Sequence, residues 1–441
     1  RTNDKKYTIS IWFKKSALAS AGYLAINYEN SDNRGYIVLD ANDKINTYDK
    51  QGGYDRMNMT SNFVLRDCNS WYHYVQAVDT TLSSNRVKTY LNGVDVTSDW
   101  TVSTAIQQND TLGFQSGTTS NGYIIGAQQS PNTFFDGLMT HVHWIDGTQY
   151  AASTFGETDT TTGIWKPKTA PSVTYGNNGF FLKFENSGSM GTDSSGNSNN
   201  FSIGGGTLTQ TLDTPSNVFA TMNAATLPAA QVNINKGNLS KTNTPTSNAW
   251  RSFYGTIGAS SGKYYWELKI DNIESSDPNN FRFGVIDAGQ MTDGADNNSF
   301  HNQSRGYAYS AQNGNKGNNG SFTSYGSSFT TGDVISCAVD LDNHKIYWAK
   351  NGTWQNSGDP TSGSTGTGSA FDLATGYTYL PVIAQYYGNE QFSLNFGNGK
   401  FATTSVSSAQ NPDDGIGIFE YDVPAGYRSW CTKSINAEEY S

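Results

Sequence analysis

The sequence is poor in cysteine. It has three cysteines in 441 residues, Cys68, Cys337 and Cys431. Three thiols cannot all pair with one another, and none of them has the C-x-x-C spacing of a zinc or redox site. Cys337 falls on the expected inward side of a strand, where a thiol packs as a small apolar residue. We therefore expect packing, and not disulfides or bound zinc, to stabilise the fold.

The sequence is also poor in charge. Only 15% of its residues are charged, the net charge is −10 and the pI is about 5.0. Clusters of Lys and Arg that could neutralise phosphates are missing, which argues against a nucleic-acid partner. No apolar run approaches the roughly 20 residues that a membrane-spanning helix needs. We therefore expect neither nucleic-acid binding nor membrane insertion.

Windows with the apolar spacing of a helix are rare, and strand patterns take their place. The chain has 46 Gly, 26 Tyr, 22 Phe and 10 Trp, which is typical of many short strands and turns. The clearest stretch is residues 332–354, GDVISCAVDLDNHKIYWAKNGTW, where apolar and polar residues alternate on both sides of a turn at 342–344. A second turn, Asn351-Gly352, follows. This pattern predicts a β-hairpin at the centre of a sandwich.

The strand pattern occurs in two blocks. At roughly 100–250 residues per β-domain, the length of the chain predicts two domains. Alternating strands fill residues 1–185 and return over residues 232–427, whereas residues 186–231 are small and polar, which predicts an extended linker. We expect residues 428–441 to continue into a region beyond this sequence. The predicted fold is all-β, with two tandem antiparallel β-sandwiches.

Several motifs occur in the order of known families. In the second block they are GKYYWE at 262–267, FGV at 283–285, GYAY at 306–309, the hairpin at 332–352, LPV at 380–382 and LNFG at 394–397. With these motifs the second block resembles a SPRY domain. The first block contains ISIWFK at 9–14, WYHY at 71–74 and YLNG at 90–93. It resembles a laminin-G-like, concanavalin A-type jelly roll, and both resemblances imply sandwiches that mostly bind ligands.

The connector carries two further motifs. DSSGN at 193–197 and DTPSN at 213–217 precede the second block, which ends with PAGY at 424–427. This order is similar to virion proteins of marine bacteriophages. The resemblance implies a tail-fibre, spike or head-fibre component of the virion, with other virion proteins as partners and a host surface glycan or protein as ligand. It also implies a homo-oligomer, and fibre proteins are often trimers. Because such an analogy does not establish function, a secreted cellular lectin or adhesin remains an alternative.

Catalysis is the other alternative, because concanavalin A-type jelly rolls include glycosidases. Glu267 and Asp271 share the polar face of one strand, but four residues at ~3.3 Å each separate them by about 13 Å. Glycosidase carboxylates lie roughly 5–5.5 Å or 6.5–9.5 Å apart. The pair fails this test, and we predict a protein without catalytic residues. A carboxylate pair from separate loops, in a polysaccharide-degrading enzyme, stays open.

Loops rich in Asp and Asn are candidates for Ca²⁺, which prefers oxygen ligands. The candidate ligands are Asp40, Asp43, Asp193, Asp293 and Asp296. Asx turns produce the same sequences without metal, so both interpretations stay open, and we expect no other cofactor. His141 and His143 are two apart on a predicted strand and share a face that could suit a metal, although packing is the usual role of such a face.

A glycan site needs aromatic rings that stack on sugar faces and polar groups that bond to hydroxyls. The long loops at 312–328 and 355–369 are where we expect recognition. The candidate ligand-binding residues near them are Tyr307, Tyr309, Tyr325, Trp354, Tyr386 and Tyr387. Core packing is the competing interpretation for Tyr307, Tyr309 and Tyr386, which lie in strands. Tyr325 and Trp354 lie in loops and have less reason to be buried.

Overall fold

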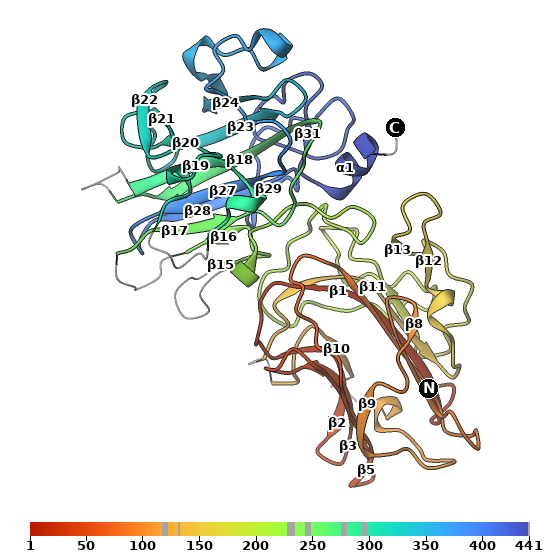
Figure 1. Cartoon of the computed structure of the whole chain (residues 1–441). Helices are drawn as coiled ribbons and strands as arrows, with labels where there is room; N and C mark the ends of the chain where they lie inside the picture. Colours follow the sequence, from red (N-terminus) through yellow and green to blue (C-terminus); the bar gives the residue numbers. More distant parts are fainter. Residues whose placement is uncertain are drawn as a thin grey trace. The chain divides into compact units, whose positions relative to one another are not determined.

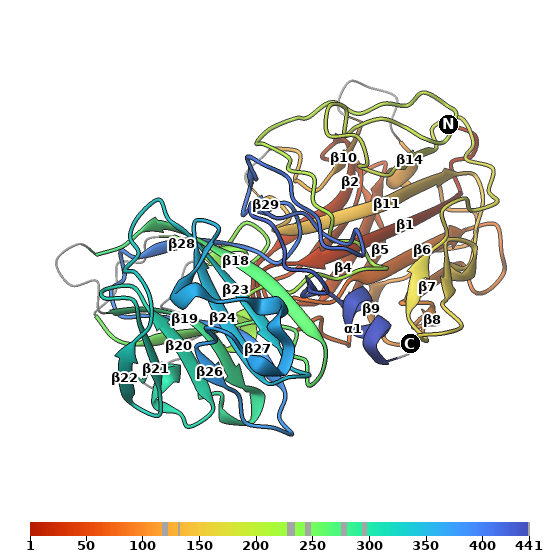
Figure 2. The same ribbon diagram turned by 90° about the horizontal axis from the view of Figure 1, so that it is seen from above.

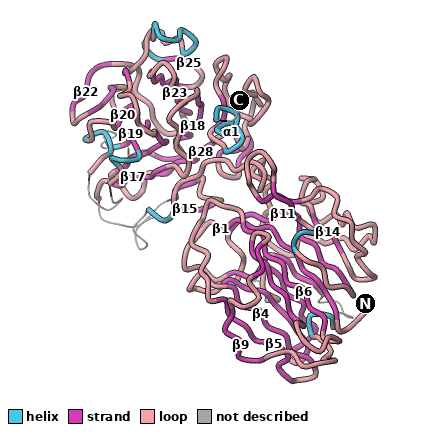
Figure 3. The backbone as a smooth tube through the Cα atoms, turned by 45° about the vertical axis from the view of Figure 1, so that its right-hand side comes forward, coloured by secondary structure: helices cyan, strands magenta, loops and turns pink. Residues whose placement is uncertain are grey.

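The structure is a computed structural model (Figure 1), which describes residues 1–116, 122–130, 133–226, 234–242, 248–274, 280–292 and 298–439. The chain divides into two compact units, residues 1–210 with 214–216, and residues 211–213 with 217–441. Strands dominate both units and the helices are short, as the tube in Figure 3 shows. The predicted all-β fold, built from antiparallel sandwiches, is confirmed.

The first unit has two six-stranded antiparallel sheets. One has the order β14 (Phe180–Leu182), β11 (Gly137–Asp146), β1 (Lys6–Lys15), β6 (Tyr72–Asp79), β7 (Val87–Leu91) and β8 (Val94–Asp95). Figure 2 shows β11, β1 and β6 side by side. The other sheet has the order β10 (Tyr123–Ile125), β2 (Gly22–Asn30), β3 (Asn33–Leu39), β4 (Ile45–Gln51), β5 (Tyr54–Ser61) and β9 (Trp100–Thr104). Outside the sheets lie the hairpin of β12 (Gly156–Thr158) and β13 (Trp165–Pro167), and the 3-10 helices η1 (Gly113–Gln115) and η2 (Ala152–Thr154).

Strand β1 shows how the sequence pattern produces this sandwich. Its apolar residues at odd positions, Tyr7, Ile9, Ile11 and Phe13, pack in the core of the first unit. The even positions between them are buried too. Residues of the segment 147–178, among them Phe155, pack against the outer face of the same sheet. The strand is therefore covered on both faces, which an alternating pattern by itself does not predict.

A buried carboxylate holds η1 against the second sheet. Asp49 on β4 is 0% exposed, and its oxygens accept hydrogen bonds from the amides of Gly113 (2.7 Å) and Phe114 (2.8 Å). The Phe114 ring then lies in the core, 5.1 Å from Trp144. Burial raises the pKa of Asp49 to about 7, because a charge inside a protein is poorly solvated. Asp49 thus fixes η1, although η1 begins 64 residues later in the sequence.

The second unit also has two sheets. The nine-stranded sheet runs β15 (Ile234–Asn235), β16 (Ser240–Lys241), β28 (Gln391–Asn395), β18 (Lys263–Asn272), β23 (Val334–Asp340), β24 (Lys345–Lys350) and β25 (Thr353–Trp354), with β26 (Phe371–Asp372) on β24 and β31 (Arg428–Ser429) on β18. The six-stranded sheet runs β17 (Arg251–Tyr254), β27 (Tyr379–Gln385), β19 (Phe281–Asp287), β20 (Gly306–Ser310), β21 (Asn315–Asn318) and β22 (Ser321–Ser324). The remaining elements are the pair β29 (Lys400–Phe401) and β30 (Thr404–Ser405), the 3-10 helices η3 (Ala224–Thr226), η5 (Ala288–Gln290), η6 (Phe300–Asn302), η7 (Gln355–Ser357) and η8 (Pro360–Thr365), and the α-helix α1 (Thr432–Glu439).

The hairpin predicted from residues 332–354 is formed by β23 and β24. Cys337 pairs with Trp348 across the two strands, and both side chains are fully buried in the core of the second unit. The first turn closes with His344 at a φ of 59°. The second contains Asn351 and Gly352, at φ values of 49° and 78°. Both turns use the left-handed backbone conformation that Asn and Gly adopt most readily.

The stretch predicted as a linker, residues 186–231, is divided between the two units near residues 210–217. In its first part, Phe201 packs edge-on against Phe180 at 4.7 Å. In its second part, Ala220 and Met222 lie in the core of the second unit. Residues 428–439 form β31 and α1 of the second unit. Among the described residues, no helix has the length and apolarity that crossing a membrane requires.

Candidate ligand-binding groove

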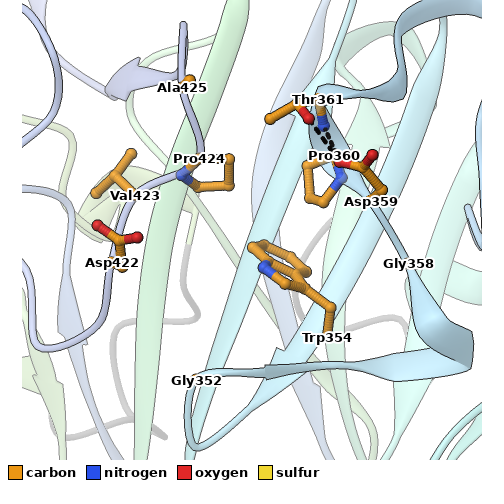
Figure 4. Close-up of a pocket in the computed structure, with 10 residues that line it drawn as sticks. All are labelled: Gly352, Trp354, Gly358, Asp359, Pro360, Thr361, Asp422, Val423, Pro424 and Ala425. Atoms are coloured by element: carbon orange, nitrogen blue, oxygen red, sulfur yellow. Dashed lines mark hydrogen bonds between the residues drawn. The ribbon is translucent and has the colours of Figure 1, made fainter.

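A groove of about 410 Å³ opens on the second unit (Figure 4). Two segments distant in sequence form its walls. The first wall comes from the loop after β24, and the second from a segment that we call the strap, residues 418–425. The described residues that line the groove are Gly352, Trp354, Gly358, Asp359, Pro360, Thr361, Asp422, Val423, Pro424 and Ala425. They include one aromatic ring, two carboxylates and no Lys or Arg.

The first wall is fixed by local hydrogen bonds. Asp359 caps η8, and its carboxylate accepts bonds from the Thr361 amide (2.9 Å) and the Thr361 hydroxyl (2.6 Å). These bonds lower the pKa of Asp359. The hydroxyl of Tyr427 donates to the carbonyl of Pro360 at 3.1 Å. The half-buried Trp354 stands between the walls in Figure 4 and meets the ring of Tyr265 edge-on at 6.5 Å.

The second wall is bonded to Glu267 of β18, a side chain that is 0% exposed. One carboxylate oxygen accepts the amide of Tyr421 (2.9 Å) and the hydroxyl of Tyr265 (3.0 Å). The other accepts the amide of Glu420 (2.9 Å) and the side-chain amide of Asn395 (3.2 Å). Burial raises the pKa of Glu267 to about 7, although the two backbone amides lower it. The strap is therefore bonded to the sheet immediately before the residues that line the groove.

The close approach of the two walls requires glycine at position 352. Gly352 has a φ of 78°, and a Cβ there would lie 2.6 Å from Cδ1 of Tyr421. Any larger residue would push the strap away from the turn that precedes Trp354. The Asn351-Gly352 turn thus serves the hairpin and the groove together.

The groove has the features of a sugar-binding site. A Trp face with carboxylate oxygens and a hydroxyl at its rim can stack on a sugar ring and accept bonds from its hydroxyls. Asp359 and Asp422 lie on opposite walls in Figure 4. A glycosidase needs one protonated carboxyl as general acid, whereas the lowered pKa of Asp359 keeps this group ionised. In the chain as described, no group of three His, Cys, Asp or Glu side chains could hold a metal ion.

The structure places one of the six predicted ligand-binding residues, Trp354, in the groove. Three others contradict the prediction because they are core residues: Tyr307 is 5%, Tyr309 0% and Tyr325 7% exposed. Tyr325, expected in an open loop, packs edge-on against Trp348 at 5.8 Å. Their rings are covered by other side chains and are not available for stacking on a ligand.

Tyr386 and Tyr387 lie together but are not among the groove residues. Both are half-buried, their rings meet edge-on at 5.2 Å, and Tyr386 also contacts Trp250 at 5.7 Å. Their amides donate to one carboxylate oxygen of Glu390, at 3.3 Å and 3.1 Å. Burial raises the pKa of Glu390 to about 8. A role of this tyrosine pair in ligand binding stays a prediction.

In the loops predicted to bind Ca²⁺, the described carboxylates bond to other groups of the protein. Asp40 accepts the amides of residues 42 and 44 and the side chain of Asn46, and Asp43 pairs with Lys15. Asp193 accepts the amides of residues 181, 195 and 199 at 2.8 to 2.9 Å. These are the bonds of Asx turns, which leave few oxygen lone pairs for a cation. Asp293 and Asp296 lie outside the described residues.

The histidine pair of the first unit is packed and not arranged for a metal. His141 sits at an irregularity of β11 with a φ of 46°, while His143 stacks on Phe181 at 3.9 Å and its Nδ1 bonds to the Tyr175 hydroxyl at 3.0 Å. His73 stacks on Trp12 at 4.4 Å. Burial lowers the pKa of all three histidines, to about 3 for His73, to about 4 for His141 and well below the usual value for His143.

The sequence reasoning missed the residues that complete the groove. Asp359 and Thr361 fall within the loop at 355–369, where recognition was expected, but they were not singled out. Asp422 and the strap have no local pattern that marks them. Glu267 was recognised only as a polar-face residue, because its partners Glu420 and Tyr421 are more than 150 positions away.

Two family models match the chain. The SPRY domain model matches residues 263–399, and the concanavalin A-like lectin/glucanases superfamily model matches residues 1–152. Among solved structures, the crystal structure of the SPRY domain of human HERC1 is 21% identical, covers 37% of this chain and 91% of that chain, and gives a TM-score of 0.29. The crystal structure of a human SPRY domain is 16% identical, covers 37% and 94%, and gives a TM-score of 0.29. From the two family matches, the chain carries a concanavalin A-like domain in its first unit and a SPRY domain in its second.

Proposed function

We propose that the chain is a non-enzymatic adhesion protein whose second unit binds a neutral glycan in the groove around Trp354. The observation that carries the proposal is the half-buried Trp354, placed between walls that present Asp359, Thr361 and Asp422. An indole face stacks on the apolar face of a sugar ring, and the oxygens around it accept bonds from hydroxyls. The concanavalin A-like and SPRY domains are consistent with binding or adhesion.

The charge of the groove supports a neutral or amine-bearing sugar. Two carboxylates line it, and its described lining contains no cationic side chain. An acidic sugar such as a uronate or a sulfated residue would meet like charge there, with no cation to offset the repulsion. We therefore expect the ligand to be a neutral polysaccharide segment and not an acidic one.

We infer that the protein acts as a virion component, as a phage tail fibre, spike or head fibre. The order of the modules and the connector motifs DSSGN and DTPSN support this proposal. In this setting the chain assembles with other virion proteins and with copies of itself, a trimer being one form, and meets the host surface outside the cell. Imaging of particles with an antibody against the chain tests the location. If the antibody labels protein that cells secrete and does not label particles, the result would favour the cellular lectin or adhesin.

The direct test is a glycan array probed with the full chain and with Trp354→Ala. Loss of the stacking ring should cost about 1.5 kcal/mol, roughly tenfold in affinity. Tyr377→Ala is the matched control, because Tyr377 is a 39% exposed aromatic residue of the same unit outside the groove. Equal binding by the wild type and Trp354→Ala would refute the site.

The enzyme alternative has one supporting observation, the two carboxylates on facing walls of the groove. It is tested by incubating the full chain with the polysaccharides that it binds and measuring new reducing ends. If the wild type releases new reducing ends and Asp422→Asn does not, the enzyme alternative would replace the adhesion proposal. Binding without new reducing ends would support the adhesion proposal.

A further inference from the structure

One buried side chain binds two successive amides in the middle of the strap. Residues 422–425 line the groove, and the two residues just before them donate their amides to Glu267 at 2.9 Å each. After them, the amide of Gly426 donates to Asp413 at 2.8 Å. Val423 packs in a small cluster with Tyr265 and Phe419. Glu267 thus joins the middle of the strap to the central strand of the sheet through two backbone hydrogen bonds.

Glu267 also reaches the other side of the groove. The hydroxyl of Tyr265 donates to it at 3.0 Å and accepts a bond from the hydroxyl of Ser336 at 2.8 Å. The ring of Tyr265 contacts Trp354 at 6.5 Å and Phe419 of the strap at 4.9 Å. One carboxylate therefore orients the ring that supports Trp354 and the backbone that carries the opposite wall.

We propose that Glu267 is the positioning residue of the groove, that its ionised carboxylate holds the strap in the binding arrangement, and that protonation releases the strap. This inference rests on the proposed function of the groove. Both oxygens of the carboxylate accept two hydrogen bonds each. A carboxylic acid turns one of these acceptors into a donor, so one of the four donors (the two strap amides, the Tyr265 hydroxyl or the Asn395 side-chain amide) must lose its partner or reverse its bond.

The groups around Glu267 do not counter this effect. The titratable residues that face it are Tyr265, Glu420 and Tyr421, and Asp422 lies near Tyr265. None is a cation, and the Glu420 carboxylate is bonded to the amide and hydroxyl of Ser407. The two strap amides lower the pKa of Glu267 while burial raises it to about 7. The two strap amides favour the ionised form, so a state in which these bonds are broken while Glu267 stays buried has a higher pKa, and lowering the pH through neutrality favours that state.

The test is amide hydrogen exchange of Glu420 and Tyr421 in the full chain, corrected for the intrinsic pH dependence, for the wild type and Glu267→Gln at pH 8 and pH 6. In the wild type, exchange should rise at least tenfold on going to pH 6. In Glu267→Gln, whose neutral amide imitates the protonated state, it should be high at both values. Glu390→Gln is the matched control, because Glu390 is also buried with a raised pKa but bonds to Tyr386 and Tyr387 instead of the strap.

Equal, pH-independent protection in the wild type and Glu267→Gln would overturn the proposal. If Glu267→Gln does not fold, Tyr265→Phe replaces it: losing one donor to the carboxylate should move the release of the strap to higher pH, and an unchanged midpoint would overturn the proposal. Glycan binding is measured on the same samples. If the strap responds as expected and no glycan binds at any pH, the proposed function fails while the role of Glu267 stands.

Discussion

Three histidines of the first unit should make it sensitive to mild acid. His73, His141 and His143 are neutral in the folded state because burial lowers the pKa of each. In the unfolded chain a histidine titrates near 6.5. Below that pH the unfolded state binds more protons than the folded state, so the free energy of unfolding falls as the pH decreases. The loss begins near pH 6.5 and continues to about pH 4 or 3.

The size of the effect follows from the same values. Between pH 7 and pH 5, each histidine that stays neutral in the fold costs about 2 kcal/mol, and three cost about 6 kcal/mol. Asp49 acts in the opposite direction, because its raised pKa of about 7 makes the folded state bind a proton over this range. Protonation of Asp49 offsets about 2 kcal/mol of the loss in unfolding free energy. The net loss of about 4 kcal/mol is a large share of the roughly 5–15 kcal/mol that stabilises a domain.

The assay is native-state amide exchange of peptides from β1, β6 and β11 in the full chain, from which the unfolding free energy of the first unit is obtained at pH 7 and pH 5. His73→Gln should lose about 2 kcal/mol less than the wild type over this range. His344→Gln, in a turn of the second unit, is the control and should leave the result for the first unit unchanged. The reasoning is refuted if the wild type and His73→Gln show the same pH dependence.

Two further substitutions test the backbone contacts that fix the loops. Asp49→Ala leaves the amides of Gly113 and Phe114 buried without acceptors, and should lower the denaturation midpoint of the first unit by an amount equivalent to about 2–5 kcal/mol; a loss below 1 kcal/mol would show that η1 is held by other contacts. Gly352→Ala places a methyl group against Tyr421 at a φ of 78° and should cost about 1–3 kcal/mol in thermal unfolding of the second unit. It should also weaken glycan binding, and unchanged melting and binding together would contradict the close packing of the two walls.

The fold could be predicted because its signals are local. The alternation in β23 and β24 and the Asn351-Gly352 turn lie within one short stretch, so sequence spacing alone determines the hairpin. Burial of single rings depends instead on distant segments. Tyr325 follows the short strand β22 and Trp354 ends the short strand β25, both near Gly-rich loops, yet Tyr325 packs on Trp348 while Trp354 remains half-buried at the groove. No local pattern distinguishes the two.

The candidate site could be predicted only in part, for the same reason. Trp354 and the loop at 355–369 were recognised from aromatic and loop composition. The strap enters the site through bonds to Glu267 across 153 and 154 positions of sequence, and such pairings leave no periodicity to read. The Asp-rich loops show the same limit for a metal site. Asx turns and calcium loops use the same residues, and only the donors that surround Asp40 and Asp193 separate the two.

The same hydrogen-bonding arrangement holds three loops of the chain in place. Its three cysteines are free, and three buried carboxylates with raised pKa values each accept two successive backbone amides of a loop. The pairs are Asp49 with Gly113 and Phe114, Glu267 with Glu420 and Tyr421, and Glu390 with Tyr386 and Tyr387. Bonds to a charged acceptor are strong enough to order a loop without a disulfide, and protonation of the acceptor weakens them. A fold that is tied in this way keeps its sheets through apolar burial over a wide pH range, while the loops that the carboxylates hold respond to protons near neutrality.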